Sequence, residues 1–183
     1  IALNAGWDLM SFDVHIEINS PADVFAELVN SGILVAVTGY DNGALFYDPS
    51  LPPFLNSLTA IEAGFGYWIK VNSSVIISTE GLPLGDDFSK DLAAGWNLMG
   101  YWPANSQAPQ DAFAEQVASG NLVAVTGYNN GALFYDPSLP PFLNSLNSLD
   151  NGFGYWVKVN DAVGGFVYPA AGLARAPVSQ VQE

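Results

Sequence analysis

The sequence predicts a strand-dominated α+β fold made of two tandem, pseudo-symmetric units. Three observations predict it. The segment VAVTGYDNGALFYDPSLPPFLNSL at residues 35–58 returns at residues 123–146 with one change, Asp41 to Asn129. The flanking segments are also repeated: GWDLM at residues 6–10 is similar to GWNLM at residues 95–99, and GFGYWIKVN at residues 64–72 is similar to GFGYWVKVN at residues 152–160. Within each copy a short helical pattern lies among strand patterns, so each unit is expected to run strand–helix–β-hairpin–loop–strands.

The repeat also predicts the domain limits. We expect repeat unit 1 over residues 1–85, repeat unit 2 over residues 86–173, and a tail or linker over residues 174–183. The tail is expected from its Ala, Pro, Val and Gln content. Units of this size bury a modest fraction of their surface and gain stability from packing on a neighbour. Because the join between them is short, the two units are expected to touch.

The first elements of each unit are a strand and a capped helix. A strand is expected over residues 9–12, after the Gly-Trp pair. Ser20 is a suitable N-cap and Pro21 a suitable first helical residue, and an apolar stripe follows. Gly32 is expected to end the helix. In the second copy Ala108 stands at the cap position and cannot accept the capping hydrogen bond.

The next element is a β-hairpin. Asn42-Gly43, repeated as Asn130-Gly131, is typical of a two-residue hairpin turn. Such a turn would place Phe46 opposite Gly39, where the ring would cover a bare backbone, and Tyr47 opposite Thr38.

An irregular segment and two strands complete the unit. Residues 49–58 cannot be regular structure, because Pro52-Pro53 removes two hydrogen-bond donors. Strands are expected over residues 67–71 and residues 75–78. This segment and the hairpin before it are nearly identical in the two copies, whereas the first strand and helix differ more. A shared surface role and recent gene conversion both explain that pattern.

Composition excludes several classes of function. Half of the residues are hydrophobic and 13% are aromatic, which indicates a folded protein. The chain has 18 acidic residues against 4 Lys and Arg, and its net charge of -14 argues against binding to nucleic acid or to anionic membranes. No apolar run is long enough for membrane insertion. The lack of cysteine excludes disulfides, thiolate catalysis and Cys-based zinc sites.

No catalytic motif is present, and the chain is not expected to be an enzyme or to need a cofactor. His15 is the only histidine and has no counterpart in the second copy. The acidic cluster of Asp86, Asp87 and Asp91 is more typical of a solvated linker than of a calcium loop. We therefore expect no metal site, and a stability that is independent of calcium.

The repeated aromatic residues are the candidate ligand-binding groups. Strand alternation in residues 66–70 puts Tyr67 and Ile69 on one face, and Trp68 with Lys70 on the other. Trp68 is thus expected to face solvent or to lie under a loop. Amphipathic rings suit the apolar faces and hydroxyl groups of sugars, although all these rings could instead be core.

Two carboxylates complete the candidate set. Asp48 and Asp136 precede proline, a common place for a turn to start, with ligand contact as the alternative role. The full set of candidate ligand-binding residues is Trp68, Trp156, Tyr40, Tyr47, Tyr128, Tyr135, Asp48 and Asp136.

Three motifs carry a resemblance to a known repeat. They are GWNLMGYW at residues 95–102, VTGYNNGALFYDP at residues 125–137 and LDNGFGYWVKV at residues 149–159. The chain resembles the GWNL…GYW(I/V)-type tandem repeat module of large secreted bacterial proteins, which stands beside surface-anchoring, polysaccharide-degrading and adhesive domains. The resemblance implies a secreted, non-enzymatic module, and it assigns no ligand. The first copy departs from the pattern at Asp8, Ser11 and Asp13.

The sequence thus favours an extracellular or cell-surface, non-catalytic carbohydrate-binding module with two equivalent units. Its expected partners are a polysaccharide or cell-surface glycan and the other domains of a larger parent chain. The alternative is a structural or adhesive spacer module of a secreted or cell-surface protein.

Overall fold

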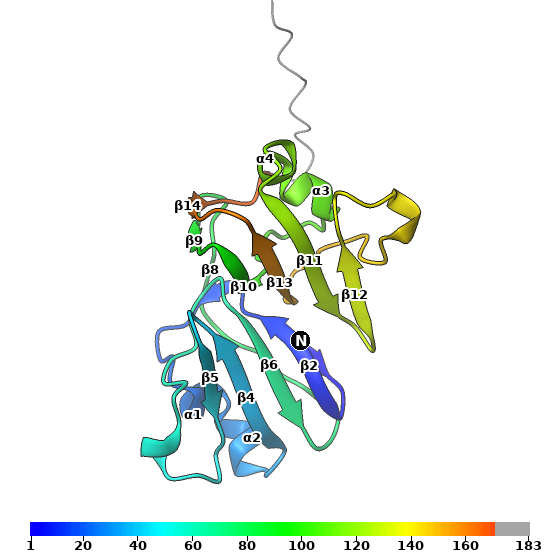
Figure 1. The fold of residues 1–183 in the computed structure, drawn as a ribbon. Coiled ribbons are helices and arrows are strands. Elements are labelled where there is room, and N and C mark those ends of the chain that lie inside the picture. Colours follow the sequence, from blue (N-terminus) through cyan, green and yellow to red (C-terminus); the bar gives the residue numbers. More distant parts are fainter. Residues whose placement is uncertain (171–183) are drawn as a thin grey trace, which may run out of the picture.

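The structure, a computed structural model, describes residues 1–170. The fold is strand-dominated, with several antiparallel sheets and short helices (Figure 1). This confirms the predicted class. The tail expected over residues 174–183 lies outside the described residues. No helix in residues 1–170 is long and apolar enough to cross a membrane.

Two four-stranded sheets form the body of the protein. In each sheet the strand that contains Gly-Tyr-Trp lies between the Gly-Trp strand and the first strand of the hairpin. All of these pairs are antiparallel. The first sheet has the order β2 (Gly6–Ser11), β6 (Gly66–Val71), β4 (Leu34–Tyr40) and β5 (Ala44–Tyr47). The second has the order β10 (Gly95–Gly100), β13 (Gly154–Val159), β11 (Leu122–Tyr128) and β12 (Ala132–Tyr135).

Three two-stranded sheets lie around them. The expected strand over residues 75–78 is shorter and spans Val75–Ile76, although Ile77 also exchanges backbone hydrogen bonds with Ile1. The three pairs are β1 (Ala2–Leu3) with β7 (Val75–Ile76), β3 (Val14–His15) with β8 (Leu82–Pro83), and β9 (Lys90–Leu92) with β14 (Val163–Phe166).

The helices form where the sequence predicts them, but each is broken. The chain leaves helical geometry at Phe25, where φ is -105° and ψ is 22°, and the ring of Phe25 is buried. Ser20 caps the first piece, since its Oγ accepts from the Asp23 amide at 3.2 Å. Gly32 follows the second piece with φ 67°. The pieces are α1 (Pro21–Val24), α2 (Ala26–Asn30), α3 (Pro109–Ala112) and α4 (Ala114–Ala118), and Ala108 provides no side-chain cap.

The hairpin register differs from the prediction by one residue. Thr38 lies opposite Phe46, and Gly39 lies opposite Leu45. The loop therefore contains Asp41 as well as Asn42-Gly43, and Asn42 takes the left-handed conformation with φ 51°. The predicted cover of Gly39 by Phe46 is wrong.

The ring of Tyr67 covers Gly39 instead. A Cβ at Gly39 would lie 3.2 Å from this ring, and a Cβ at Gly127 would lie 3.0 Å from the ring of Tyr155. Each sheet thus needs a glycine in the hairpin strand, because a neighbouring tyrosine crosses it.

The irregular segment after each hairpin is confirmed. It contains only a 3-10 turn, η1 (Pro53–Leu55) in the first copy and η2 (Pro141–Leu143) in the second. The tips of both segments are exposed, and Phe54 is 84% accessible to solvent. Each segment stands out from the side of its sheet (Figure 1).

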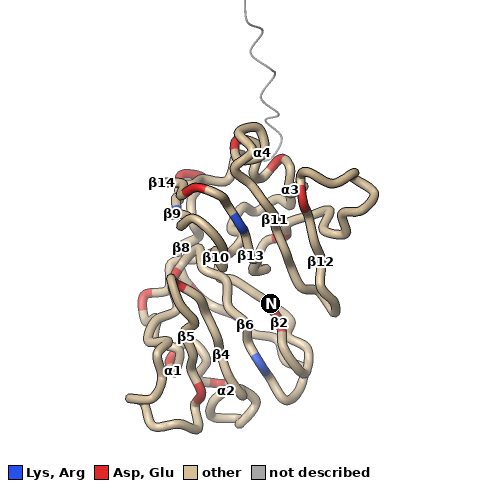
Figure 2. Tube along the Cα trace, viewed as in Figure 1, with Lys and Arg blue, Asp and Glu red and all other residues tan. Residues whose placement is uncertain are grey.

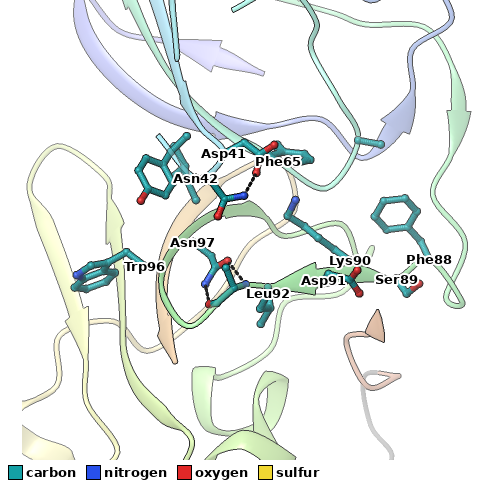
Figure 3. A pocket seen from close by; sticks show the side chains of 14 residues that line it. Asp41, Asn42, Phe65, Phe88, Ser89, Lys90, Asp91, Leu92, Trp96 and Asn97 are labelled. Atoms are coloured by element: carbon teal, nitrogen blue, oxygen red, sulfur yellow. Dashed lines mark hydrogen bonds between the residues drawn. The ribbon is translucent and has the colours of Figure 1, made fainter. Parts of the chain in front are cut away.

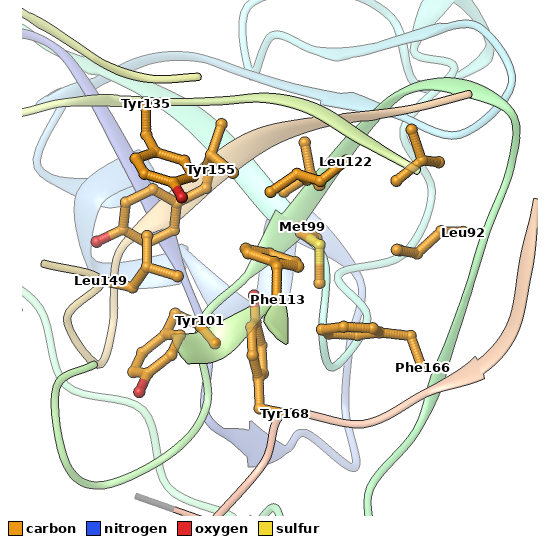
Figure 4. Packing of buried hydrophobic residues seen from close by; sticks show 14 of the residues in the cluster. Leu92, Met99, Tyr101, Phe113, Leu122, Tyr135, Leu149, Tyr155, Phe166 and Tyr168 are labelled. Carbon is orange, nitrogen blue, oxygen red and sulfur yellow. The ribbon is translucent and has the colours of Figure 1, made fainter. Parts of the chain in front are cut away.

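Each large sheet buries one face in a separate hydrophobic core. The first core contains Val37, Tyr67 and Ile69. The second is richer in aromatic rings, and Figure 4 shows Phe166 and Tyr168, which come from the end of β14 and the segment after it, packed with Phe113. Leu84, which precedes the predicted limit at residue 85, belongs to this second core.

The other faces of the two large sheets meet each other, and we call this contact the seam. Leu9 is 2% exposed because it lies against Gly154, where a Cβ would approach it to 2.9 Å. Leu98 lies against Gly66 in the same way, at 3.1 Å. A side chain at either position would also press on a backbone carbonyl, that of Met10 at 2.9 Å from Gly154 and that of Met99 at 3.0 Å from Gly66, so glycine gives the closest fit.

Backbone hydrogen bonds also cross the seam. The Ser11 amide donates to the Gly152 carbonyl at 2.9 Å, and the Gly100 amide donates to the Gly64 carbonyl at 3.0 Å. Isolated bridges join Met10 to Phe153 and Phe65 to Met99. The strands β2, β6, β10 and β13 therefore form a closed circuit of backbone pairing, and the expected contact between the two copies is present.

Candidate functional site

The two predicted tryptophans lie in the seam. Trp68 is half-buried and its ring centre lies 5.2 Å from that of Tyr128. Trp156 is also half-buried, and it lies 5.2 Å from Tyr40. Four of the predicted site residues are thus brought together as two pairs, each with one member from each copy. Trp68 lies under the other copy and not under a loop of its own.

Tyr47 and Tyr135 belong to the cores. They are 8% and 7% exposed. The shift in hairpin register explains the difference from the expected position, because Tyr47 lies opposite Val37 on the core face and not opposite Thr38 on the seam face. A slip of one residue moves a strand side chain to the other face of its sheet. These two tyrosines face away from the seam and cannot line a site there.

Asp48 and Asp136 start turns, as the proline after each of them predicts. The Oδ1 of Asp48 accepts from the amide and the hydroxyl of Ser50, at 2.8 and 2.7 Å. These hydrogen bonds hold the pKa of Asp48 below its ordinary value. Asp136 makes the same contacts with Ser138.

Two exposed tryptophans beside the seam were not among the predicted site residues. Trp7 is 39% exposed and Trp96 is 40% exposed. Each carries a lysine ammonium 5.6 Å from its ring centre, Lys70 over Trp7 and Lys158 over Trp96. The repeated Gly-Trp motif could have identified them. Trp7 and Trp96 each lie two residues before a leucine of the seam, and residues two apart in a strand share one face of the sheet.

Trp96 extends one of the aromatic pairs into a row. Its ring lies 6.3 Å from that of Trp156 in an edge-to-face arrangement, and Trp156 in turn contacts Tyr40. The row therefore begins on the second copy and ends at the hairpin of the first. Edge-to-face contacts of this kind contribute about 0.5–1.5 kcal/mol beyond burial of area.

A cleft of about 500 Å³ opens beside this row. Its walls come from both copies, with the tip of the first hairpin on one side and β9 with the start of β10 on the other (Figure 3). Aromatic and polar side chains both reach it. Its side-chain lining includes Tyr40, Asp41, Asn42, Phe65, Phe88, Lys90, Asp91, Trp96 and Asn97.

Lys90 is the cation of this cleft. Its ammonium lies 2.8 Å from the centre of the Phe65 ring, which comes from the first copy. Burial lowers the pKa of Lys90 to about 8, and the nearby charges of Asp41, Glu62 and Asp91 oppose that shift. Figure 3 shows the side chain extended from β9 toward Phe65 and Asp41.

Aromatic rings, two carboxylates and one ammonium group line the cleft. His15 is exposed and lies beside the ring of Phe88. Asp91 accepts a hydrogen bond from the Gly165 amide at 2.7 Å, so it supports the β9–β14 contact. In residues 1–170 no three His, Asp or Glu side chains gather in a way that could hold a metal ion.

Comparison with known proteins provides no further assignment. No protein-family model, no curated protein and no solved structure matches the chain.

Proposed function

We propose that the protein is an extracellular or cell-surface, non-catalytic carbohydrate-binding module. The observation that carries the proposal is the exposed Trp96, which lies beside a cleft whose walls alternate aromatic rings with charged and amide groups. A sugar presents apolar C–H faces together with hydroxyl groups, and this mixture of side chains suits both parts. The partners are a polysaccharide or cell-surface glycan and other domains of a larger parent chain.

The two copies act in this proposal as two equivalent, pseudo-symmetric units. Matching cross-strand partners support it: Trp7 lies opposite Lys70, and Trp96 lies opposite Lys158. Reciprocal contacts across the seam support it too, because each copy contributes one tryptophan and one tyrosine to the two aromatic pairs. Equivalent units of this kind would present Trp7 and Trp96 as equivalent exposed rings.

Affinity electrophoresis tests the proposal. Native gels that contain soluble polysaccharides of different composition should retard the protein in at least one case. The double variant Trp7→Ala with Trp96→Ala should migrate freely, since both rings are partly exposed and their removal leaves the cores intact. Phe54→Ala is the matched control, because it removes an exposed ring that lies outside the cleft. Equal retardation of all three proteins would contradict the proposal.

A structural or adhesive spacer is the second candidate, and a specific observation favours it. The rings of Trp68, Trp156, Tyr40 and Tyr128 already contact each other across the seam. Four repeated aromatic residues that hold two units together provide rigidity without a ligand. A protein that no polysaccharide retards, and that loses stability when Trp68 is replaced, would fit the spacer.

A further inference from the structure

The one difference within the repeated 24-letter segment falls in the cleft. Asp41 lines the cleft at the tip of the first hairpin, and its counterpart in the second copy is Asn129. All other side chains of residues 35–58 are the same as those of residues 123–146. The substitution therefore changes the charge of a hairpin tip and leaves its shape unchanged.

Lys90, which faces the tip of the first hairpin across the cleft, also differs from its counterpart in the other copy. Leu3 to Trp7 aligns with Leu92 to Trp96, so Lys90 corresponds to Ile1. The backbone agrees, because Leu3 pairs with Val75 as Leu92 pairs with Val163. A carboxylate and an ammonium group thus occur together on one side of the seam, whereas an amide and an aliphatic side chain stand at the corresponding positions of the other side.

These charges restrict the chemistry of a ligand. A sugar hydroxyl donates one hydrogen bond and accepts others, so it can bind a carboxylate and an ammonium group at once. The lining has two carboxylates, Asp41 and Asp91, against the single cation Lys90. The whole chain has a net charge of -14, so uronic acids and sulfated sugars are repelled before they reach the cleft.

We propose that this cleft is the single principal sugar site of the chain, and that it holds an uncharged hexose residue of a polysaccharide. Trp96 stacks on the apolar face of the sugar ring, while Asp41 and Lys90 bind its hydroxyl groups. This inference rests on the proposed carbohydrate-binding function, but it assigns one principal site to the two similar units, so that Trp7 and Trp96 are not equivalent in binding.

Isothermal titration calorimetry with defined oligosaccharides tests the inference. The probes are a β-1,4-linked gluco-hexaose, the corresponding manno-hexaose and a hexauronate of the same length. We expect at least one neutral hexaose to bind with one site per chain, and the hexauronate to bind at least tenfold more weakly. Two sites per chain, or a preference for the hexauronate, would overturn the inference.

Matched variants locate the site. Asp41→Asn should weaken binding roughly tenfold, because a hydrogen bond to a charged carboxylate is replaced by one to a neutral amide. It should fold normally, since asparagine already occupies the equivalent position at Asn129. Asn129→Asp is its control and should change affinity less than twofold. Trp96→Ala should likewise weaken binding at least tenfold, and Trp7→Ala less than twofold.

The outcomes separate the two proposals. The wild-type protein could bind a neutral hexaose while Trp7→Ala weakens binding as much as Trp96→Ala, and Asn129→Asp changes affinity as much as Asp41→Asn. In that case the single-site inference is wrong and the carbohydrate-binding function stands. If no hexaose and no soluble polysaccharide binds, the proposed function fails and the inference fails with it. Thermal melts of every variant, followed by near-ultraviolet circular dichroism, show whether a loss of affinity reflects a loss of fold.

Discussion

Cations and aromatic rings are paired throughout this acidic protein. Among residues 1–170 the lysines are Lys70, Lys90 and Lys158, and each lies over an aromatic ring. Lys70 and Lys158 lie beside exposed tryptophans, where water solvates the ammonium group (Figure 2 shows their places on β6 and β13). Lys90 differs because it lies between the two copies and is partly removed from water.

The pH dependence of stability should reveal the burial of Lys90. Its folded pKa of about 8 lies below the ordinary 10.5, so between these values the unfolded chain holds a proton that the folded chain has released. Stability due to this group therefore rises as pH increases from about 8 to about 10.5, and the full desolvation penalty applies below pH 8.

Lys90→Met removes that penalty. We expect the variant to be more stable than wild type by about 1 kcal/mol at pH 7, a value reduced for solvent screening of a partly exposed group. The difference should shrink as the pH rises and disappear above about pH 11.5, where the lysine is neutral in both the folded and the unfolded chain. Urea denaturation at a series of pH values measures it. Lys158→Met is the control, and a gain independent of pH for Lys90→Met would contradict the assignment.

The aromatic pairs across the seam should couple energetically. A double-mutant cycle of Tyr40→Leu and Trp156→Leu is expected to give a coupling free energy of about 0.5–1.5 kcal/mol, because the two rings are in direct contact at 5.2 Å. The cycle of Tyr128 and Trp68 should give a similar value. Tyr40 with Trp68 is the control pair, and it should be additive if each tyrosine contacts only the tryptophan of the other copy.

At the scale of elements, side chains replace the backbone pairing that the irregular segments lack. The Asp48 amide donates to Oδ1 of Asn56 at 2.9 Å, and the Asn56 side chain donates back to the Asp48 carbonyl at 3.2 Å. Ser57 Oγ also accepts from the Phe46 amide. Asn144 makes the same contacts with Asp136. A segment whose side chains satisfy backbone groups tolerates little change, and this structural constraint explains its identity in the two copies as well as a surface role or gene conversion does.

The helix starts provide a matched test of capping. Ser20 and Ala108 have nearly the same backbone conformation, with φ and ψ of -64° and 140° against -67° and 145°. Ala108→Ser should therefore gain a cap and stabilise the protein by about 0.5–1 kcal/mol, while Ser20→Ala should destabilise it by about 1 kcal/mol. Equilibrium urea unfolding measures both changes. The change in the free energy of unfolding should have opposite signs in the two variants. A loss of stability in both would contradict the shared geometry of the two helix starts.

At the scale of the whole molecule, the seam makes each copy depend on the other. Separation of the copies would expose Leu9, Leu98 and the four paired rings, and it would leave the Ser11 and Gly100 amides without their partners. Small units with a large apolar contact rarely keep their full stability alone.

Separately produced halves should therefore reassociate. We expect residues 1–85 and residues 86–183 each to melt at a lower temperature than the intact chain, and a stoichiometric mixture to recover part of that loss together with the near-ultraviolet signal of the seam tryptophans. Gly154→Ala in the second half should abolish recovery, since its Cβ would lie 2.9 Å from Leu9 and from the Met10 carbonyl. Gly131→Ala has open space and is the control. Halves that melt like the intact protein would show that the seam contributes nothing.

The sequence by itself determined the features that depend on local chemistry. Repetition and alternation predicted the strand-dominated α+β fold, Ser20 and Gly32 marked the ends of a helical segment, and the two prolines predicted an irregular segment after the hairpin. Each depends on a few neighbouring residues, whose propensities and hydrogen bonds act in the same way in any fold.

Only the tertiary structure shows which faces of the two large sheets pack against each other and which side chains lie on them. The hairpin register depended on one loop residue, Asp41, and the one-residue shift moved Tyr47 into the core. The partner of Trp68 is Tyr128, a residue far away in the sequence, and no local pattern specifies such a contact. The cleft at Lys90 exists only because the hairpin of one copy reaches β9 of the other. Packing between distant segments sets these positions, since it depends on the shapes of both surfaces together.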